Sequence, residues 1–283
     1  MHSSNQSDTQ MIDLHCHSTF SDGLHSPEEL LNKALQAKLE IMALTDHDTI
    51  EGSIRLIELA QHQAIRIIPG IEISTRWKKY DIHILGYQLD LQSEHLSALI
   101  KSQEANRHQR ALEIAEKLTQ LGIEDVLSKV TLIAGHRRIG RPHFAQLLID
   151  EGRVVEKQAA FSRFLGHGKI AYVPTPWVSI EEAVQTIIQA GGQAVLAHPA
   201  KYKLTRTKLH ELITVFKEAG GEGMEVVSGE GMANETQELA GLCLRYQLLA
   251  SSGSDFHGEG MSRISLGRQA RLPEYCKPIW QEW

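Results

Sequence analysis

Short apolar runs alternate with amphipathic stretches over the first part of the chain. Runs of strand length occur at 11–15, 40–46, 66–74 and about 82–87. Between the first two, the sequence Ser-Pro-Glu-Glu from Ser26 predicts a helix, because it supplies an N-cap, a proline at the first helical position and Glu29 for a capping box. A second helix is expected over 49–63. This order is typical of βα proteins, in which helices cover a sheet of parallel strands.

The alternation stops in the middle of the chain and then returns. From 91 to 169 the pattern indicates amphipathic helices without a convincing strand, one of them ending at Gly122. Further strands are expected at 194–198, 224–228 and 248–255. We therefore predict an α/β barrel domain formed by 11–90 and 170–283, a helical subdomain inserted at 91–169, and a disordered leader at 1–10.

Composition narrows the class of protein. The chain is 42% hydrophobic and 23% charged, as in ordinary folded domains, and its formal charge of −6 excludes the broad basic surface of a duplex-DNA binder. No apolar run approaches the roughly 18 residues that span a bilayer. Cys16, Cys243 and Cys276 have neither metal-ligand spacing nor the density of a disulfide framework, which favours a cytoplasmic protein. No obligate protein partner is evident.

The unusual feature is a set of histidines placed on strands and at their ends. His15 and His17 lie two apart in extended backbone, so both rings point to one side while Cys16 points to the other. Carboxylates follow strands in the same way. Because the carboxyl ends of barrel strands share one rim, these side chains should line one cavity. The expected metal ligands are His15, His17, Asp22, His47, Glu72, His83, His198, Asp255 and His257.

This cluster is too large for one tetrahedral zinc site, which needs about four ligands. Two or three divalent ions fit better. Imidazole and carboxylate without thiolate suit zinc, manganese or iron, and the residues alone leave the choice open. We expect Asp46 to orient His47 rather than to bind metal itself.

The motifs resemble the polymerase and histidinol phosphatase (PHP) family. They are His15-Cys16-His17-Ser18 with Ser21-Asp22-Gly23, Ala43-Leu44-Thr45-Asp46-His47-Asp48-Thr49, Pro69-Gly70-Ile71-Glu72, Ala197-His198-Pro199 and Gly253-Ser254-Asp255-Phe256-His257. The similarity covers about 11–90 and 170–283. It implies a distorted seven-stranded (β/α)7 TIM-like barrel, the PHP fold, with the inserted helical subdomain outside the family core.

The resemblance also implies a trinuclear metal site and phosphoesterase activity, with Mn²⁺ as the first choice of ion and Zn²⁺ or Fe²⁺ as alternatives. By position it places His15, His17, Glu72 and Asp255 around one ion, Asp22, His47 and His257 around a second, and Glu72, His83 and His198 around a third. Asp22, Glu72, Asp255 and His257 are the expected catalytic residues. A hydroxide bridging two ions would attack phosphorus.

Within the family, the inserted helices and Gly140-Arg141-Pro142-His143 are similar to stand-alone 3′,5′-nucleoside bisphosphate phosphatases, a group that includes 5′-to-3′ exoribonucleases acting on short RNA. The expected reaction is removal of the 3′-phosphate of a nucleoside 3′,5′-bisphosphate, and trimming of short 5′-phosphorylated RNA. The expected partners are therefore a small nucleotide and short RNA. The alternatives are a histidinol-phosphate phosphatase and a noncatalytic metal-binding module.

The insertion is expected to recognise the substrate, because the metal ligands can bind one reacting phosphate but cannot select a second. Arg141 and His143 would lie near a helix N-terminus, where backbone N–H groups also favour an anion. Arg107 and Lys201 are further candidates for the same pocket. The alternative is that Arg141 is a solvated helix-end residue and that His143 is a cap.

Overall fold

The computed structural model describes residues 11–135 and 138–283, so the predicted leader at 1–10 lies outside the described residues. Their main feature is a seven-stranded sheet in which the strands follow one another in chain order. The strands are β1 (Ile12–Asp13), β2 (Ile41–Leu44), β3 (Arg66–Trp77), β4 (Tyr80–Tyr87), β5 (Gln193–Leu196), β6 (Gly223–Ser228) and β7 (Leu249–Gly253). Each predicted strand is present, within a few residues of its expected bounds.

The sheet curves into a nearly closed barrel, because β7 returns beside β1. The N–H of Leu14 donates to the carbonyl of Ser252 at 3.1 Å, and the N–H of Asp255 donates to the carbonyl of His15 at 2.7 Å. Gly253 permits this approach: a Cβ there would lie 2.3 Å from the Cβ of His15. The seam of the barrel therefore places the end of β7 directly against the first histidine.

The sequence pattern predicted a parallel sheet, but the observed sheet contains one antiparallel strand. β4 runs antiparallel to both β3 and β5, whereas the other neighbouring pairs are parallel. The cause is the tight connection at Lys78 and Lys79, since a parallel crossover needs a dozen or more residues. His83 consequently lies near the start of β4 and pairs with Ser74 of β3. The prediction of an all-parallel barrel was wrong at this strand.

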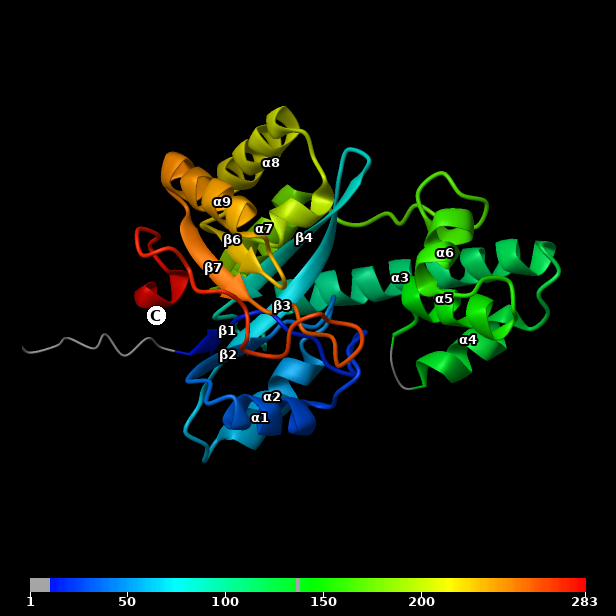
Figure 1. Cartoon of the computed structure of the whole chain (residues 1–283), viewed down its shortest axis with the longest axis horizontal. Helices are drawn as coiled ribbons and strands as arrows, with labels where there is room; N and C mark the ends of the chain where they lie inside the picture. Colours follow the sequence, from blue (N-terminus) through cyan, green and yellow to red (C-terminus); the bar gives the residue numbers. More distant parts are fainter. Residues whose placement is uncertain (1–10, 136–137) are drawn as a thin grey trace, which may run out of the picture.

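Helices cover the outside of the barrel (Figure 1). They are α1 (Pro27–Gln36), α2 (Glu51–Ala60), α7 (Ile180–Gln189), α8 (Arg206–Glu218) and α9 (Ala233–Tyr246), with short 3₁₀ turns η2 (Pro199–Tyr202) and η3 (Ile279–Glu282). Ser26 caps α1 and forms the predicted capping box with Glu29. Ser179 caps α7 by accepting a hydrogen bond from the N–H of Glu182. α2 is shorter than expected and begins without a side-chain cap.

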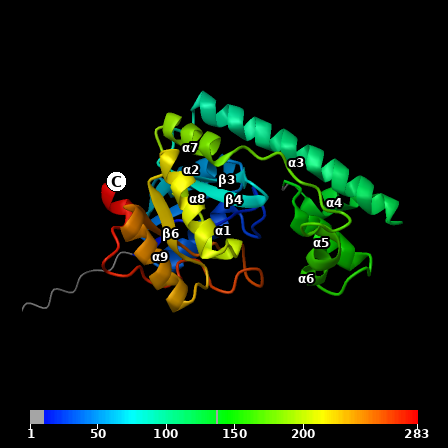
Figure 2. The same ribbon diagram turned by 90° about the horizontal axis from the view of Figure 1, so that it is seen from above.

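The helices between β4 and α7 project to one side of the barrel (Figures 1 and 2). They are α3 (Glu94–Gln120), α4 (Val126–Ala134), α5 (Arg141–Asp150), α6 (Lys157–Ala160) and the π-helical turn η1 (Phe161–Leu165). Ile114 and Leu118 on the distal part of α3 pack with Phe144 of α5 in a hydrophobic core of their own. Leu96 and Leu99 near the start of α3 pack into the barrel core instead. The long helix α3 therefore ties the inserted helices to the barrel.

None of the helices among the described residues combines the length and the apolar character needed to cross a membrane.

Candidate metal centre

His15 and His17 follow β1 and are fully buried. Their Nε2 atoms lie 3.1 Å apart, so both rings point into the same space. Cys16 points the other way, as strand alternation predicts, and its thiol lies 3.4 Å from the carbonyl oxygen of Ala43 in the core. The short strand thus presents a chelating pair to the rim.

Glu72 lies at the centre of the histidine cluster. Its Oε2 atom is 3.3 Å from Nε2 of His15, 3.2 Å from Nε2 of His17 and 3.0 Å from Nδ1 of His47. Its Oε1 atom is 2.9 Å from Nδ1 of His83 and 2.9 Å from Nε2 of His198. One buried carboxylate therefore faces five imidazoles from four strands or strand ends.

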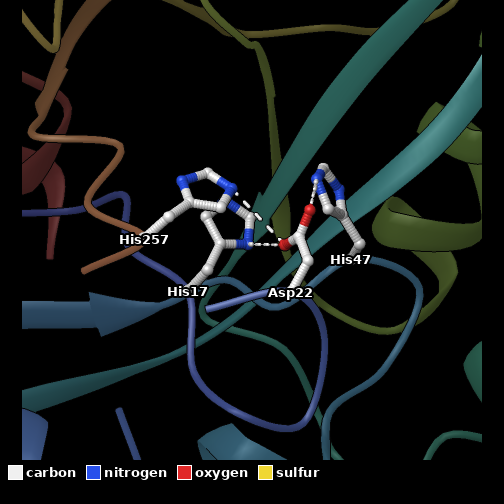
Figure 3. A group of neighbouring side chains, drawn as sticks. All are labelled: His17, Asp22, His47 and His257. Carbon is white, nitrogen blue, oxygen red and sulfur yellow. Dashed lines mark ion pairs between the residues drawn. The ribbon is translucent and has the colours of Figure 1, made fainter. Parts of the chain in front are cut away.

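Asp22 belongs to a second group, with His17, His47 and His257 (Figure 3). Its Oδ1 atom lies 3.4 Å from Nε2 of His257, and its Oδ2 atom lies 3.9 Å from Nε2 of His47. Asp22 reaches the cluster from the loop after β1, in which the carbonyl of Ser18 accepts hydrogen bonds from the N–H groups of Ser21 and Gly23.

Asp255 completes the cluster from the end of β7. Its Oδ1 atom lies 3.3 Å from Nε2 of both His15 and His17. The nine expected ligands are thus brought together, and their close groups overlap the expected sets without coinciding with them. The four groups whose ligand atoms lie within 4.8 Å of one another are His17, Asp22, His47 and His257; His15, Glu72 and His198; His15, His17 and Asp255; and His47, Glu72 and His83.

Buried polar atoms without hydrogen bonds indicate that this cluster fits cations. Among the described residues, Oε2 of Glu72 and Nδ1 of His47 and of His198 are buried without a hydrogen-bond partner. Such atoms are costly unless a ligand satisfies them. Imidazole and carboxylate donors without thiolate suit zinc, manganese or iron.

The charges of the cluster favour cations as well. Burial alone would raise the pKa of Glu72, but the surrounding histidines hold it well below the usual range of a glutamate. Burial likewise opposes charge on His257, yet Asp22 and Asp255 raise its pKa to about 9. The pKa of His47 falls to about 3, chiefly because of burial, so this ring stays neutral and has a lone pair to offer.

Glu225 holds two residues of the cluster in place and was not predicted from the sequence. This fully buried carboxylate of β6 accepts from Nδ1 of His15 at 3.0 Å and from the N–H of His198 at 2.8 Å. Such a partner fixes the orientation of a ligating ring. The available signal was an acidic residue inside the apolar run of β6.

The prediction that Asp46 orients His47 was wrong. Its Oδ1 atom accepts from the N–H of Ser18 at 2.7 Å and from Oγ of Ser21 at 2.6 Å, while its Oδ2 atom accepts from Oγ of Ser18 at 2.6 Å. Asp46 therefore anchors the loop that carries Asp22. Both of its carboxylate oxygens accept hydrogen bonds from this loop, so Asp46 is not engaged with the ring of His47.

An arginine-lined cavity of about 230 Å³ opens beside the cluster, and we call it the arginine cavity. Asp22, His47 and His83 form its inner wall. The outer wall carries Arg107 and Arg110 of α3, Arg138 just before α5, and Arg141 at the start of α5. Arg107 and Arg141 were predicted from the sequence, whereas Arg110 and Arg138 were not, because only the folded insertion places all four together.

The four arginines differ in how fully they are engaged. Arg107 pairs with the buried carboxylate of Asp48 through both Nε and Nη2, so its guanidinium holds α3 to the barrel. Arg110 is buried, and burial holds its pKa well below the usual range. Arg138 donates through Nη1 to the backbone carbonyl of Asp48 and lies 3.9 Å from the carboxylate of Glu104. Arg141 makes looser contacts, 3.4 Å to Asp81 and 3.2 Å to the carbonyl of Val173.

The other two candidates for substrate binding lie outside the arginine cavity. Nδ1 of His143 accepts from the N–H of Gly140 at 2.9 Å, which is a contact at the start of α5. Lys201 of η2 pairs with Asp255 and lines a different cavity.

Comparison with known proteins places the chain in a family. The sequence profile of the PHP domain matches residues 13–151, which include the first four strands of the barrel and part of the inserted helices. A 5′-3′ exoribonuclease of Haemophilus influenzae is 39% identical over 97% of this chain and 100% of its own length. A 3′,5′-nucleoside bisphosphate phosphatase of Chromobacterium violaceum is 38% identical over 96% of this chain and 95% of its own.

A solved structure agrees with the sequence matches. An amidohydrolase from Chromobacterium violaceum, solved with bound sulfate and no metal, covers 96% of this chain and 95% of its own with a TM-score of 0.89 and 37% identity. The similarity spans both the barrel and the insertion. The cluster of histidines and carboxylates lies at the rim formed by the strand ends. The chain belongs to the PHP family of phosphoesterases.

Proposed function

We propose that this chain is a metal-dependent phosphoesterase that removes the 3′-phosphate of nucleoside 3′,5′-bisphosphates and trims short 5′-phosphorylated RNA from its 5′ end. Two full-length relatives bear names that correspond to these two reactions. The observation that carries the proposal is the arginine cavity beside the metal ligands, because it offers a place for a second phosphate that does not react.

The reacting phosphate would lie at the cluster. We propose that the nine ligands hold two or three divalent ions, with Mn²⁺ the first to test and Zn²⁺ and Fe²⁺ next. Such ions supply positive charge to the phosphoryl oxygens and lower the pKa of water. Asp22, Glu72, Asp255 and His257 would act at the reacting group, and Glu225 would hold the ring of His15 in place.

The remote 5′-phosphate would be bound by the inserted helices. Arginine binds phosphate through two parallel hydrogen bonds, and the arginine cavity presents four guanidinium groups against two carboxylates, Asp22 and Asp81. Arg141 and Arg138 are the best candidates, since Arg107 is already paired with Asp48. We therefore assign the insertion at 91–169 to substrate recognition. His143 would support Arg141 through the start of α5 rather than touch the substrate.

A comparison of three substrates tests this proposal. Purified protein supplied with Mn²⁺ should release phosphate from adenosine 3′,5′-bisphosphate with a much higher kcat/KM than from adenosine 3′-monophosphate or histidinol phosphate. A higher kcat/KM for histidinol phosphate would identify the enzyme as that phosphatase instead. If no substrate is hydrolysed by protein that retains its metal, the cluster is a noncatalytic metal-binding module.

A further inference from the structure

A second cavity, of about 390 Å³, borders other ligands of the cluster, and we call it the distal cavity. His198, Asp255 and His257 form its inner wall, and its outer wall comes from η2, the β6–α9 connection and the loop after β7. It shares no lining residue with the arginine cavity. A phosphoryl group at the cluster would therefore border both cavities.

The two cavities differ in charge. The cations that line the distal cavity are already paired, Lys201 with Asp255 and Arg263 with Glu230. Its remaining surface combines apolar and hydroxyl-bearing side chains, Leu239 and Met261 among them, with the carboxylates of Glu225 and Glu235, which disfavour a second anion. It therefore suits an uncharged group with apolar faces better than it suits another phosphate. Its volume lies within the range of about 300–1,000 Å³ of small-molecule sites.

A hydroxyl group without a protein partner also lies in this wall. Oγ of Ser228 is buried and has no hydrogen-bond partner among the described residues. Buried hydroxyl groups normally make a hydrogen bond, so this one is available to a bound polar group such as a ribose hydroxyl.

The proposed reactions require different numbers of subsites. In both, the oxygen of water bonds to phosphorus, the bond between phosphorus and O3′ of the first nucleoside breaks, and O3′ takes a proton. A bisphosphate has one nucleoside, which would extend toward the arginine cavity. In RNA, a second nucleoside is attached to the same phosphate. After cleavage this nucleoside keeps the phosphate as its new 5′ end, and it needs a space of its own outside the arginine cavity.

We propose that the distal cavity binds the nucleoside that follows the scissile phosphate, so that it determines whether the enzyme trims RNA in addition to hydrolysing bisphosphates. This assignment rests on the proposed function. The same metal cluster would then hydrolyse a monoester with only the arginine cavity occupied and a diester with both the arginine cavity and the distal cavity occupied.

Filling the distal cavity separates the two activities. Gly231→Trp is suitable because a Cβ there meets only Ser228 O and Thr236 Oγ1, both at 3.8 Å, and both residues belong to the cavity wall. Met261→Trp fills the cavity from the loop after β7. Gly241→Trp is the matched control, because this exposed position of α9 has nothing within 4 Å of its Cβ.

Three substrates should be compared with each variant: adenosine 3′,5′-bisphosphate, the methyl ester of its 3′-phosphate, and 5′-phosphorylated diadenylate. The methyl ester is a diester without a second nucleoside, so it separates diester chemistry from the subsite. We expect both filling variants to lower kcat/KM for the dinucleotide at least tenfold, mostly through KM, while both small substrates stay within twofold of wild type. The control should match wild type on all three.

Several results would overturn the assignment. One is a dinucleotide rate that neither filling variant changes, and another is an equal loss on all three substrates in variants with unchanged melting temperature. A wild-type enzyme that cleaves the bisphosphate and the methyl ester but not the dinucleotide would also refute it while leaving the bisphosphate activity intact. Failure of the wild type on the bisphosphate would instead refute the proposed function itself.

Discussion

Replacing Arg141 by alanine should weaken hydrolysis of a nucleoside 3′,5′-bisphosphate and spare hydrolysis of a nucleoside 3′-monophosphate. In the free protein, Arg141 lies 3.4 Å from Asp81, which Arg76 already contacts at 3.0 Å. Its guanidinium also lies 5.3 Å from the ring centroid of Tyr172. Because these contacts are long or shared, a bound phosphate can replace them without breaking a strong pair.

The size of the effect follows from the bond that is lost. A hydrogen bond to a charged group contributes about 1.5–3 kcal/mol. Since about 1.4 kcal/mol corresponds to a factor of ten, kcat/KM for the bisphosphate should fall about 10-fold to 150-fold. The monophosphate has no group in the arginine cavity, so its kcat/KM should change less than about threefold.

The assay is phosphate release from adenosine 3′,5′-bisphosphate and adenosine 3′-monophosphate at matched metal content. Arg163→Ala is the matched control, because Arg163 is an exposed arginine of the insertion that also bonds one carbonyl, at 3.2 Å, and lies 5.4 Å from an aromatic ring centroid. It should leave both rates unchanged. Equal losses on both substrates would place Arg141 at the reacting phosphate, and no loss on either would return it to the role of a solvated helix-end residue.

Further predictions concern the metal and the scaffold. Chelation should abolish activity reversibly, and elemental analysis should find more than one transition ion per chain; full activity with one ion or none would contradict a multinuclear centre. Asp255→Ala should remove activity with little change in melting temperature, because a rim ligand contributes little to core packing. Asp46→Ala should lower the free energy of unfolding by about 2–3 kcal/mol in urea titrations, since buried donors of Ser18 and Ser21 lose their acceptor, and Asp46→Asn should lose less. Arg107→Ala should cost about 3–5 kcal/mol, because it leaves the Asp48 carboxylate buried without its cation, and a loss below about 1 kcal/mol would refute that role.

Much of the metal cluster could be predicted because most of its residues share one kind of position. Histidine or a carboxylate follows β1, β2, β5 and β7, and the ends of these strands lie on one rim. The grouping of the ligands could not be predicted in the same way. His17 belongs to two of the groups, which depends on ring orientations that the spacing of residues does not determine.

The arginine cavity was harder to predict because its walls are far apart in sequence. Arg138 and Arg110 meet the barrel only after α3 has crossed from the barrel core to the core of the inserted helices. Arg110 lies on a helix, where a single arginine is normally a solvated residue, and Arg138 lies in the connection before α5, so neither position carried a distinguishing signal. By contrast, Gly140-Arg141-Pro142 combined an arginine with a helix start, which made Arg141 recognisable.

His83 shows how one strand direction affects the site. The hydrophobic pattern of β4 gave its position but not its direction, although the few residues between the predicted third and fourth strands were too short for a parallel crossover. In a parallel strand, a residue so close to the start would lie at the opposite end of the barrel from the other ligands. Because β4 is antiparallel, its first half begins at the rim where β3 ends, and His83 lies 2.9 Å from Glu72. The reversal of this strand is therefore what gives Glu72 its fifth imidazole and lets its Oε1 atom face both His83 and His198.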